Sequence, residues 1–319
     1  MQLKNLLSFI VACIAVTSYA QQRYLDSVFT TSDVNTYEYA FKDGEALNVD
    51  VYTPADDSAS SRPLFIFVHG GGFSGGRRED ERIVRLCQEL SVRGYVAASM
   101  SYRLTRKNTD TGFGCDCPSI EKQNTFIMAT EDLYDCAFYI LKNNKEFNVN
   151  PKQLIVGGSS AGAETALKAA IQPPMCFNLP SGPISFAGVL AFAGAIEDIN
   201  MIDSSAPPAM LFHGTCDKTI PYTNAPHRYC KENSPGYLEM FGSYSIMSRY
   251  KELGRPFWTH TTCGGGHEIA DAYDDNINRK LVYEFLYKYI IKDEFCQIHN
   301  VVNKAGSDCS LNTNLIFCK

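Results

Sequence analysis

The feature that most constrains the fold is a glycine-rich turn between an apolar run and a helix-forming run. Residues 157–162 read Gly-Gly-Ser-Ser-Ala-Gly, after the apolar run 154–156 and before the alanine-rich run 163–170. They fit the pattern Gly-x-Ser-x-Gly with Ser160 at its centre. This pattern predicts a strand, a sharp turn and a helix, and the turn needs small residues because the chain reverses so tightly. Ser160 is therefore a candidate nucleophile; the alternative is an ordinary glycine- and serine-rich turn.

A second glycine-rich segment follows another predicted strand. The apolar run 63–68 leads directly into His69-Gly-Gly-Gly-Phe73, which we call the glycine loop (residues 69–73). Glycines at this position allow several backbone N–H groups to point at one place. There they can bind the oxygen that becomes negative when an ester carbonyl is attacked. We predict that Gly71, Gly72 and the amide of Ala161 are these donors, the alternative being a flexible loop.

An acid and a general base are expected after the serine, in that order along the chain. Asp217 lies in the loop that leaves the apolar strand predicted at 209–212. His267 follows three glycines after the strand predicted at 257–261. Because both loops leave the carboxyl ends of strands, we predict that Asp217 and His267 meet Ser160 on one rim of the sheet.

The alternatives to this acid and base are weaker. The chain has six histidines, so the base can be chosen by elimination. His69 belongs to the glycine loop, His213 is expected to pack at a strand end, and His260 lies inside a predicted strand. The two in polar segments without a motif are His227 and His299. The rival acids, all upstream of the strand that leads to Asp217, are Glu197, Asp198 and Asp203.

Strands and helices alternate along most of the chain. Apolar runs at 95–100 and 187–192 predict further buried strands. The spacing of apolar residues predicts helices at 82–91, 125–143 and 276–292. Two alternating segments around Asp43-Gly44, at 37–41 and 47–52, predict an antiparallel hairpin. Together these elements predict an α/β fold with a mainly parallel sheet, helices on both faces and the hairpin at one edge.

The ordered motifs resemble the α/β-hydrolase superfamily, and within it the carboxylesterases with a His-Gly-Gly-Gly oxyanion motif. The resemblance extends from about Leu47 to Leu286 and is greatest to the acetyl and feruloyl esterase-like group that acts on plant polysaccharide. Besides the segments already described, it includes residues 49–54, 101–104 and 131–133. It implies an α/β-hydrolase fold and ester hydrolysis by Ser160, His267 and Asp217 without a metal or organic cofactor. A cysteine-containing loop after Leu104 replaces the proline-rich segment expected in that group.

The substrate implied is a small or polysaccharide-linked ester with a short or aromatic acyl group. Two segments, 105–123 and 222–250, are predicted to shape its pocket. Aromatic residues in them can stack on a sugar or a phenolic group, or simply pack the loops. These aromatics are Phe113, Tyr237, Phe241 and Tyr244. Other functions that fit the same motifs are a serine peptidase, a polyester hydrolase and an inactive binding protein of this fold.

Composition and the amino terminus predict an exported, single-domain protein. The 319 residues contain no linker or repeat, so we expect one catalytic domain at 21–319 with a cysteine-rich tail from about residue 293. A net charge of -6 without a basic cluster argues against a nucleic-acid partner. Lys4, an apolar run at 6–16 and small residues at 18–20 predict a signal peptide over residues 1–20. That run is too short to be a transmembrane segment, and the alternative is lipid attachment at Cys13.

Cysteine usage also favours export. The chain has twelve cysteines, without the paired spacing of a metal site, so disulfides explain them better. An odd number remains once Cys13 is removed with the signal peptide. Cys115 or Cys117 is expected to hold the loop after Arg103. Tail cysteines expected to form staples are Cys296, Cys309 and Cys318. One specific pairing is hypothesised near the candidate site, between Cys216 and Cys263.

Overall fold

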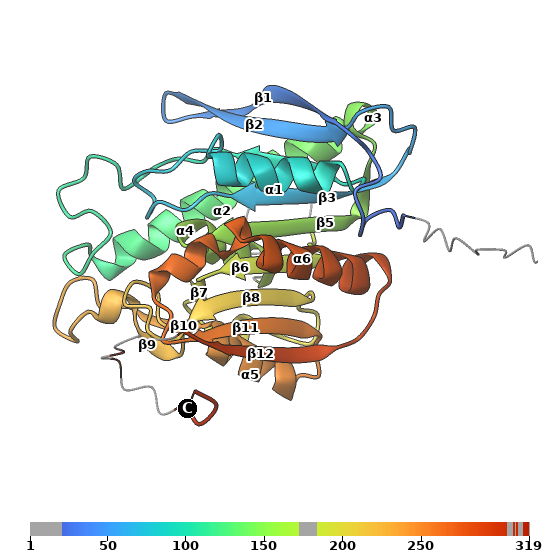
Figure 1. Cartoon of the computed structure of the whole chain (residues 1–319). Helices are drawn as coiled ribbons and strands as arrows, with labels where there is room; N and C mark the ends of the chain where they lie inside the picture. The colour runs from blue at the N-terminus through green and yellow to red at the C-terminus, as the bar shows by residue number, and fades with distance from the viewer. Residues whose placement is uncertain (1–20, 172–183, 305–308, 310, 312–314, 319) are drawn as a thin grey trace, which may run out of the picture.

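A computed structural model describes residues 21–171, 184–304, 309, 311 and 315–318. The predicted signal peptide, Cys13 and Cys176 lie outside the described residues. A nine-stranded sheet forms the centre of the described structure, in the order β1-β2-β4-β3-β5-β6-β8-β11-β12 (Figure 1). Its strands are β1 (Ser32–Lys42), β2 (Glu45–Pro54), β3 (Arg62–Val68), β4 (Val96–Met100), β5 (Val149–Ser159), β6 (Gly188–Phe192), β8 (Ala209–Gly214), β11 (Phe257–Cys263) and β12 (Gln297–Asn303).

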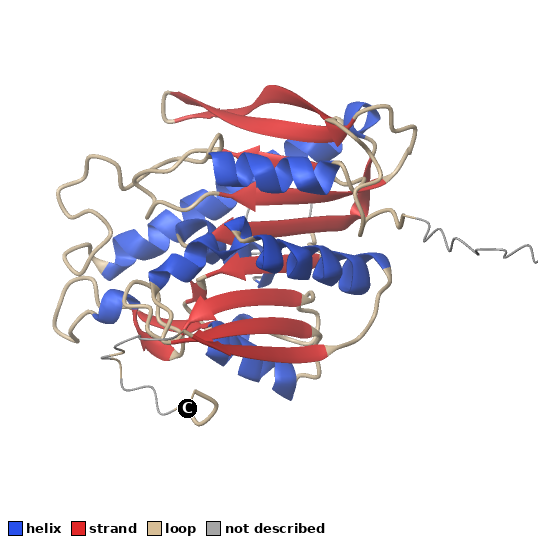
Figure 2. Cartoon of the chain, in the orientation of Figure 1, coloured by secondary structure: helices blue, strands red, loops and turns tan. Residues whose placement is uncertain are grey.

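Helices cover both faces of this sheet (Figure 2). They are α1 (Glu81–Ser91), α2 (Ser119–Lys142), α3 (Asn144–Phe147), α4 (Ala161–Ile171), α5 (Ser243–Glu252) and α6 (Asn276–Phe285), which a π-helical turn, η5 (Leu286–Ile291), continues. In the described part of the chain the 3₁₀ turns are η2 (Ile199–Met201), η3 (His227–Tyr229) and η4 (His267–Asp274). A small second sheet pairs β7 (Ala195–Ile196), β10 (Glu239–Gly242) and β9 (Asn224–Pro226).

Strand β3 shows why the sheet must be covered on both sides. Leu64, Ile66 and Val68 join the core that α2 and α4 close, whereas Phe65 and Phe67 join the core that α1 and α6 close. Successive side chains of a strand point to opposite faces, and all five are fully buried. A continuous apolar run is therefore what a central parallel strand requires. From β4 to β12 all neighbouring strands pair in parallel.

At one edge of the sheet, β1 and β2 form an antiparallel hairpin, and β2 also pairs antiparallel with β4. The predicted fold class is thus confirmed: a mainly parallel sheet, helices on both faces and an antiparallel N-terminal hairpin. Several elements differ in extent from the prediction; β1, for example, begins at Ser32 and not at residue 37. Helix α2 begins earlier, at Ser119, directly after Pro118, and the helix predicted at 276–292 divides into α6 and η5. Residues of the predicted tail form β12, which pairs with β11.

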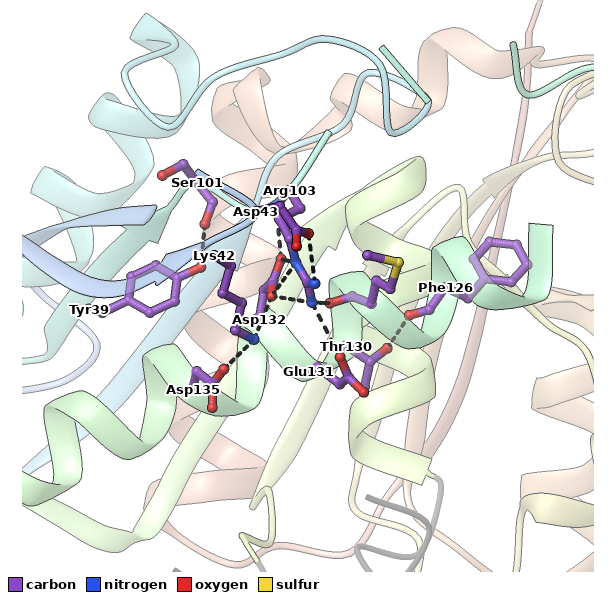
Figure 3. A network of polar contacts seen from close by, with 11 residues as sticks. Tyr39, Lys42, Asp43, Ser101, Arg103, Phe126, Thr130, Glu131, Asp132 and Asp135 are labelled. Atoms are coloured by element: carbon purple, nitrogen blue, oxygen red, sulfur yellow. Dashed lines mark hydrogen bonds and ion pairs between the residues drawn. The ribbon is translucent and has the colours of Figure 1, made fainter. Parts of the chain in front are cut away.

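A buried ionic network joins two segments that carry the family resemblance, residues 101–104 and 131–133 (Figure 3). Asp132 is fully buried and accepts hydrogen bonds from Arg103 Nε at 3.0 Å and from Lys42 Nζ at 2.8 Å. Asp43 and Glu131 each lie 3.2 Å from a terminal nitrogen of Arg103. The network joins the β1-β2 hairpin, the loop after β4 and α2. Removing one partner of such a buried pair costs several kcal/mol, so these segments fix the position of the loop after β4.

Candidate active site

Ser160 lies in the turn between β5 and α4, and its backbone is in the left-handed region with a φ of 51°. The glycines on either side are required by close contacts. A Cβ atom on Gly158 would lie 2.2 Å from the carbonyl oxygen of Gly162, and one on Gly162 would lie 2.0 Å from that of Val68. Only glycine fits at either position, so the Gly-x-Ser-x-Gly pattern follows from the tightness of the turn and from its close packing against the end of β3.

The structure brings Ser160, His267 and Asp217 into one chain of hydrogen bonds. The Ser160 Oγ atom lies 2.9 Å from His267 Nε2, and His267 Nδ1 lies 2.7 Å from Asp217 Oδ2. Ser160 follows β5, Asp217 follows β8, and His267 follows β11 and begins η4. All three therefore leave the carboxyl ends of parallel strands, where binding sites of open α/β sheets form.

Asp217 is held as a carboxylate by its surroundings. Its side chain is fully buried, and its Oδ1 atom accepts hydrogen bonds from the backbone N–H groups of Thr219 at 2.8 Å and Ile220 at 3.0 Å. The other oxygen, Oδ2, faces His267 and lies 3.5 Å from His213 Nε2. Burial alone would raise the pKa of Asp217, but hydrogen bonds from His213 and His267 outweigh it and hold the pKa well below its usual range.

His213 was expected to pack at a strand end, and it does, but it also completes the shell around Asp217. Its ring is fully buried between the Ser243 hydroxyl, 2.9 Å from Nδ1, and the Ile220 carbonyl, 3.1 Å from Nε2. The backbone N–H of Ile220 also donates to Asp217, so the loop that contains Ile220 holds both the His213 ring and the Asp217 carboxylate in place. The position of this loop depends on contacts such as that between His213 and Ser243, which are far apart in the sequence, and no local sequence pattern reveals such contacts.

The glycine loop passes directly beside Ser160. A Cβ atom on Gly70 would lie 3.4 Å from the Ser160 Cβ atom. Gly71 and Gly72 both have positive φ, 118° and 61°. Among the described residues, no protein acceptor binds the N–H group of Gly71 or Gly72, and Ala161 begins α4, where a helix leaves its first N–H groups unpaired. These are the three amides that the sequence singled out.

The loop after β4 supports the glycine loop from behind. The Tyr102 hydroxyl donates to the His69 carbonyl at 2.9 Å, and the two rings stack with centroids 4.5 Å apart. The backbone N–H of Arg106 donates to the Phe73 carbonyl, also at 2.9 Å. Sequence reasoning assigned no role to Tyr102. Since residue 103 is locked into the ionic network of Figure 3, that network positions the glycine loop as well.

A cavity of about 610 Å³ opens above Ser160 and His267. Segment 105–123 contributes Phe113 and Gly114 to its wall, as predicted, although the Phe113 ring is mostly buried against other aromatic rings. Segment 222–250 contributes Arg228 rather than the aromatic residues expected from it. Phe241 and Tyr244 line a separate depression beside α5. The sequence did not point to Arg228 as part of this wall, because an arginine in a polar segment carries no motif.

The hypothesised disulfide between Cys216 and Cys263 is wrong. Cys216 pairs with Cys309, and Cys263 pairs with Cys318, with Cα atoms 5.5 Å apart in both cases. Each active-site loop is therefore tied to the tail and not to the other loop. Cys115 pairs with Cys230, so Cys115 does hold the loop after Arg103. Among the described cysteines, those without a disulfide are Cys87, Cys117, Cys136 and Cys296. The staple expected from Cys296 is therefore wrong, whereas Cys309 and Cys318 do staple the tail.

Comparison with solved structures relates this arrangement to known proteins. The chain superposes on an esterase from the planctomycete Thermogutta terrifontis, bound to propionate, with a TM-score of 0.61 and 19% sequence identity; the match covers 79% of this chain and 93% of that chain. The chain has the α/β-hydrolase fold. The same esterase phosphorylated by paraoxon matches with a TM-score of 0.60 and 20% identity, over 84% of this chain and 97% of the other.

Sequence comparisons agree with the α/β-hydrolase fold. Residues 49–175 match the BD-FAE family. The non-reducing polyketide synthase pkbA of Emericella nidulans is 29% identical over 46% of this chain, and the AB hydrolase superfamily protein B1A11.02 of Schizosaccharomyces pombe is 28% identical over 38%. The matches cover 5% and 31% of those relatives, so the chain spans less than a third of either.

Within residues 21–171 and 184–304 and the described tail positions, no group of three or more histidine, cysteine or acidic side chains is arranged to hold a metal ion. In the same part of the chain, no helix combines the length and the apolar character needed to cross a bilayer.

Proposed function

We propose that this α/β-hydrolase is a serine carboxylesterase that hydrolyses short-chain or aromatic acyl esters. The observation that carries the proposal is the hydrogen-bonded chain from Ser160 through His267 to Asp217 at the base of an open cavity. A hydroxyl, an imidazole and a buried carboxylate in this order form the arrangement that activates a serine for attack on a carbonyl carbon.

In the first half-reaction, His267 Nε2 accepts the Ser160 proton while Oγ attacks the ester carbonyl. The negative charge that develops on the carbonyl oxygen is bound by the N–H groups of Gly71, Gly72 and Ala161. Asp217 accepts the Nδ1 proton of His267 in a hydrogen bond and stabilises the imidazolium. His267 then protonates the departing alcohol, which leaves an acyl group on Ser160.

In the second half-reaction, His267 removes a proton from water, and the resulting hydroxide attacks the acyl-enzyme. The tetrahedral intermediate uses the same backbone donors, and collapse of this intermediate releases the carboxylic acid and restores the Ser160 hydroxyl. Every proton that moves passes through His267, and Asp217 remains ionised throughout.

We further propose that the enzyme is exported and acts on acetyl or feruloyl esters, free or linked to plant polysaccharide. The three disulfides among the described residues support an oxidising compartment. The match to the BD-FAE family supports an ester substrate. The related Thermogutta terrifontis esterase has been solved with propionate and with butyrate, which supports short acyl groups here.

The test is an ester panel with residues 21–319 purified under oxidising conditions. The panel contains 4-nitrophenyl acetate and butyrate, methyl ferulate and acetylated xylan, and a fluorophosphonate probe is used to label the nucleophile. We expect hydrolysis of the short esters and a probe adduct on the peptide that contains Ser160. Absence of both hydrolysis and labelling would exclude the proposed function.

The dependence of the reaction on pH is a separate prediction. A histidine that acts as base loses that ability when it is protonated, so kcat/KM should fall as the pH is lowered. Because the pKa of Asp217 is held well below its usual range, this carboxylate stays ionised over the same pH range and adds no second proton. We therefore expect log kcat/KM to fall toward acidic pH with a slope of about one per pH unit. A flat profile or a slope of two would contradict these roles.

A further inference from the structure

The cavity above Ser160 contains a guanidinium group that the described protein leaves without a counter-ion. Arg228 lines the cavity together with Gly72, Thr219 and His267. Its Nη2 atom lies 3.8 Å from the place that a Cβ atom on Gly72 would occupy, so the guanidinium stands beside the glycine loop. In the described part of the chain no acceptor binds this side chain, and its Nε atom is buried without a partner.

The acidic groups of the cavity are already paired with residues other than Arg228. The wall of the cavity contains two carboxylates, those of Asp80 and Asp271. Both pair with Arg82: its Nε atom lies 2.9 Å from Asp80 Oδ1, and its Nη1 atom lies 2.6 Å from Asp271 Oδ2. Asp217 is satisfied by His267 and by two backbone N–H groups. Arg77 also lines the cavity, but its side chain is exposed to solvent. The half-buried Arg228 therefore adds positive charge that no carboxylate of this wall neutralises.

One carboxyl group remains near Arg228, that of Glu164 on α4. It is buried, and its Oε1 atom lies 3.5 Å from His227 Nε2. Burial raises the pKa of Glu164 well above its usual range, more than the charges of Arg228 and Lys122 lower it. Among the described residues Glu164 contacts His227 and forms no ion pair with Arg228, so it does not serve as the counter-ion. A guanidinium that is partly removed from water without a counter-ion attracts an anion strongly.

The backbone around Arg228 is held in an unfavourable conformation. Arg228 and Tyr229 have positive φ values of 58° and 53°, in a region that is unfavourable for non-glycine residues. The segment is fixed on both sides. The Arg228 N–H donates to the Thr219 carbonyl at 3.1 Å, and Cys230 is joined to Cys115, next to Gly114 in the cavity wall. Strain that the surrounding contacts maintain is typical of ligand sites.

We propose that Arg228 forms an anion subsite and that the preferred ester substrate carries a carboxylate, which Arg228 binds while Ser160 attacks the ester carbonyl. This proposal rests on the esterase function proposed above. The planar guanidinium donates two parallel hydrogen bonds to a carboxylate; of the arginines in the cavity wall, Arg82 is paired and Arg77 is exposed, whereas Arg228 is half-buried and without an ion pair among the described residues. The carboxylate can belong to the acyl half, as in a half-ester of a dicarboxylic acid, or to the alcohol half, as in an esterified uronic or hydroxy acid.

The experiment compares two matched pairs of esters. The acyl arm uses mono-4-nitrophenyl adipate and uncharged 4-nitrophenyl hexanoate, and the alcohol arm uses 4-acetoxybenzoate and uncharged 4-acetoxybenzamide. Each kcat/KM is divided by the rate of hydrolysis by hydroxide, which removes differences in intrinsic reactivity. The quantity of interest is the ratio of the anionic to the uncharged ester. We expect wild-type enzyme to show a ratio of at least about ten in one arm, which identifies the half that carries the carboxylate.

Arg228→Gln should lower that ratio about 10- to 100-fold, the range expected for a hydrogen-bonded charge pair. Arg228→Lys should keep part of it, because the charge remains but the second parallel hydrogen bond is lost. The matched control is Arg77→Gln, which removes the same charge from the exposed rim and should change the ratio less than about threefold. The wild-type ratio stands as a test even if a variant at 228 does not fold.

Two results would overturn the subsite: a wild-type ratio near one in both arms, or an equal loss of the ratio in Arg77→Gln and Arg228→Gln. Failure of the esterase function looks different. In that case wild-type enzyme would hydrolyse neither the charged nor the uncharged esters, or Ser160→Ala would hydrolyse them equally well. Ser160-dependent hydrolysis of the uncharged esters without a preference for the anionic ones would refute the subsite alone.

Discussion

Replacing Ser160 with alanine is expected to lower kcat for 4-nitrophenyl acetate by a factor of about 10⁴ to 10⁶. The substitution removes the atom that attacks the carbonyl, and the described cavity offers no second hydroxyl with an imidazole at 2.9 Å. Any remaining activity would come from water held near the backbone donors. The measurement is a steady-state rate assay, with a correction for the spontaneous hydrolysis of the ester.

Ser159→Ala is the matched control for this variant. Ser159 is the adjacent serine, but its hydroxyl is buried and donates to the Ala270 carbonyl at 2.8 Å. Its loss should lower the free energy of unfolding by about 1 kcal/mol and leave most of the esterase activity in place. The Ser160 hydroxyl bonds His267 alone, so Ser160→Ala should unfold at nearly the wild-type urea concentration. Equal activity in wild type and Ser160→Ala would refute the nucleophile.

The parts of the fold and site that sequence reasoning predicted are those that local geometry dictates. Gly158 is fixed by a contact of 2.2 Å within the turn itself, and Gly162 by one of 2.0 Å with Val68 at the end of the neighbouring strand β3, so the sequence must display both glycines. The two-faced burial of β3 likewise demands a continuous apolar run. The order of strands and loops then places Asp217 and His267 on the same edge as Ser160 without knowledge of any distance.

The features that it missed depend on contacts between remote segments. The partner of Cys216 is decided by where the chain runs after β12, and the sequence does not reveal that β12 adds to the sheet edge. Tyr102 and His213 resemble ordinary buried residues until their partners are known. Arg228 lies in the cavity because a disulfide and a backbone hydrogen bond hold a strained turn there, and none of these leaves a motif.

Asp217→Asn is expected to lower kcat by about 10⁴-fold while the protein stays folded. The asparagine carbonyl oxygen can replace Oδ1, which accepts the N–H groups of Thr219 and Ile220, so the loop keeps its hydrogen bonds. The amide NH₂ then takes the place of Oδ2 and donates toward His267 Nδ1. This selects the tautomer with the proton on Nε2, which cannot accept the Ser160 proton.

The matched control for this variant is Asp80→Asn, which changes the same functional group in the wall of the same cavity. Asp80 pairs with Arg82 at 2.9 Å and has no contact with the imidazole, so its substitution should alter kcat less than about threefold. Both variants are compared with wild type by steady-state kinetics and by urea unfolding. Because Asp217 acts only through the orientation and charge of His267, Asp217→Asn should lower kcat far more than it lowers stability. If Asp217→Asn retained a tenth or more of the wild-type kcat, the carboxylate would not be the group that sets the His267 tautomer.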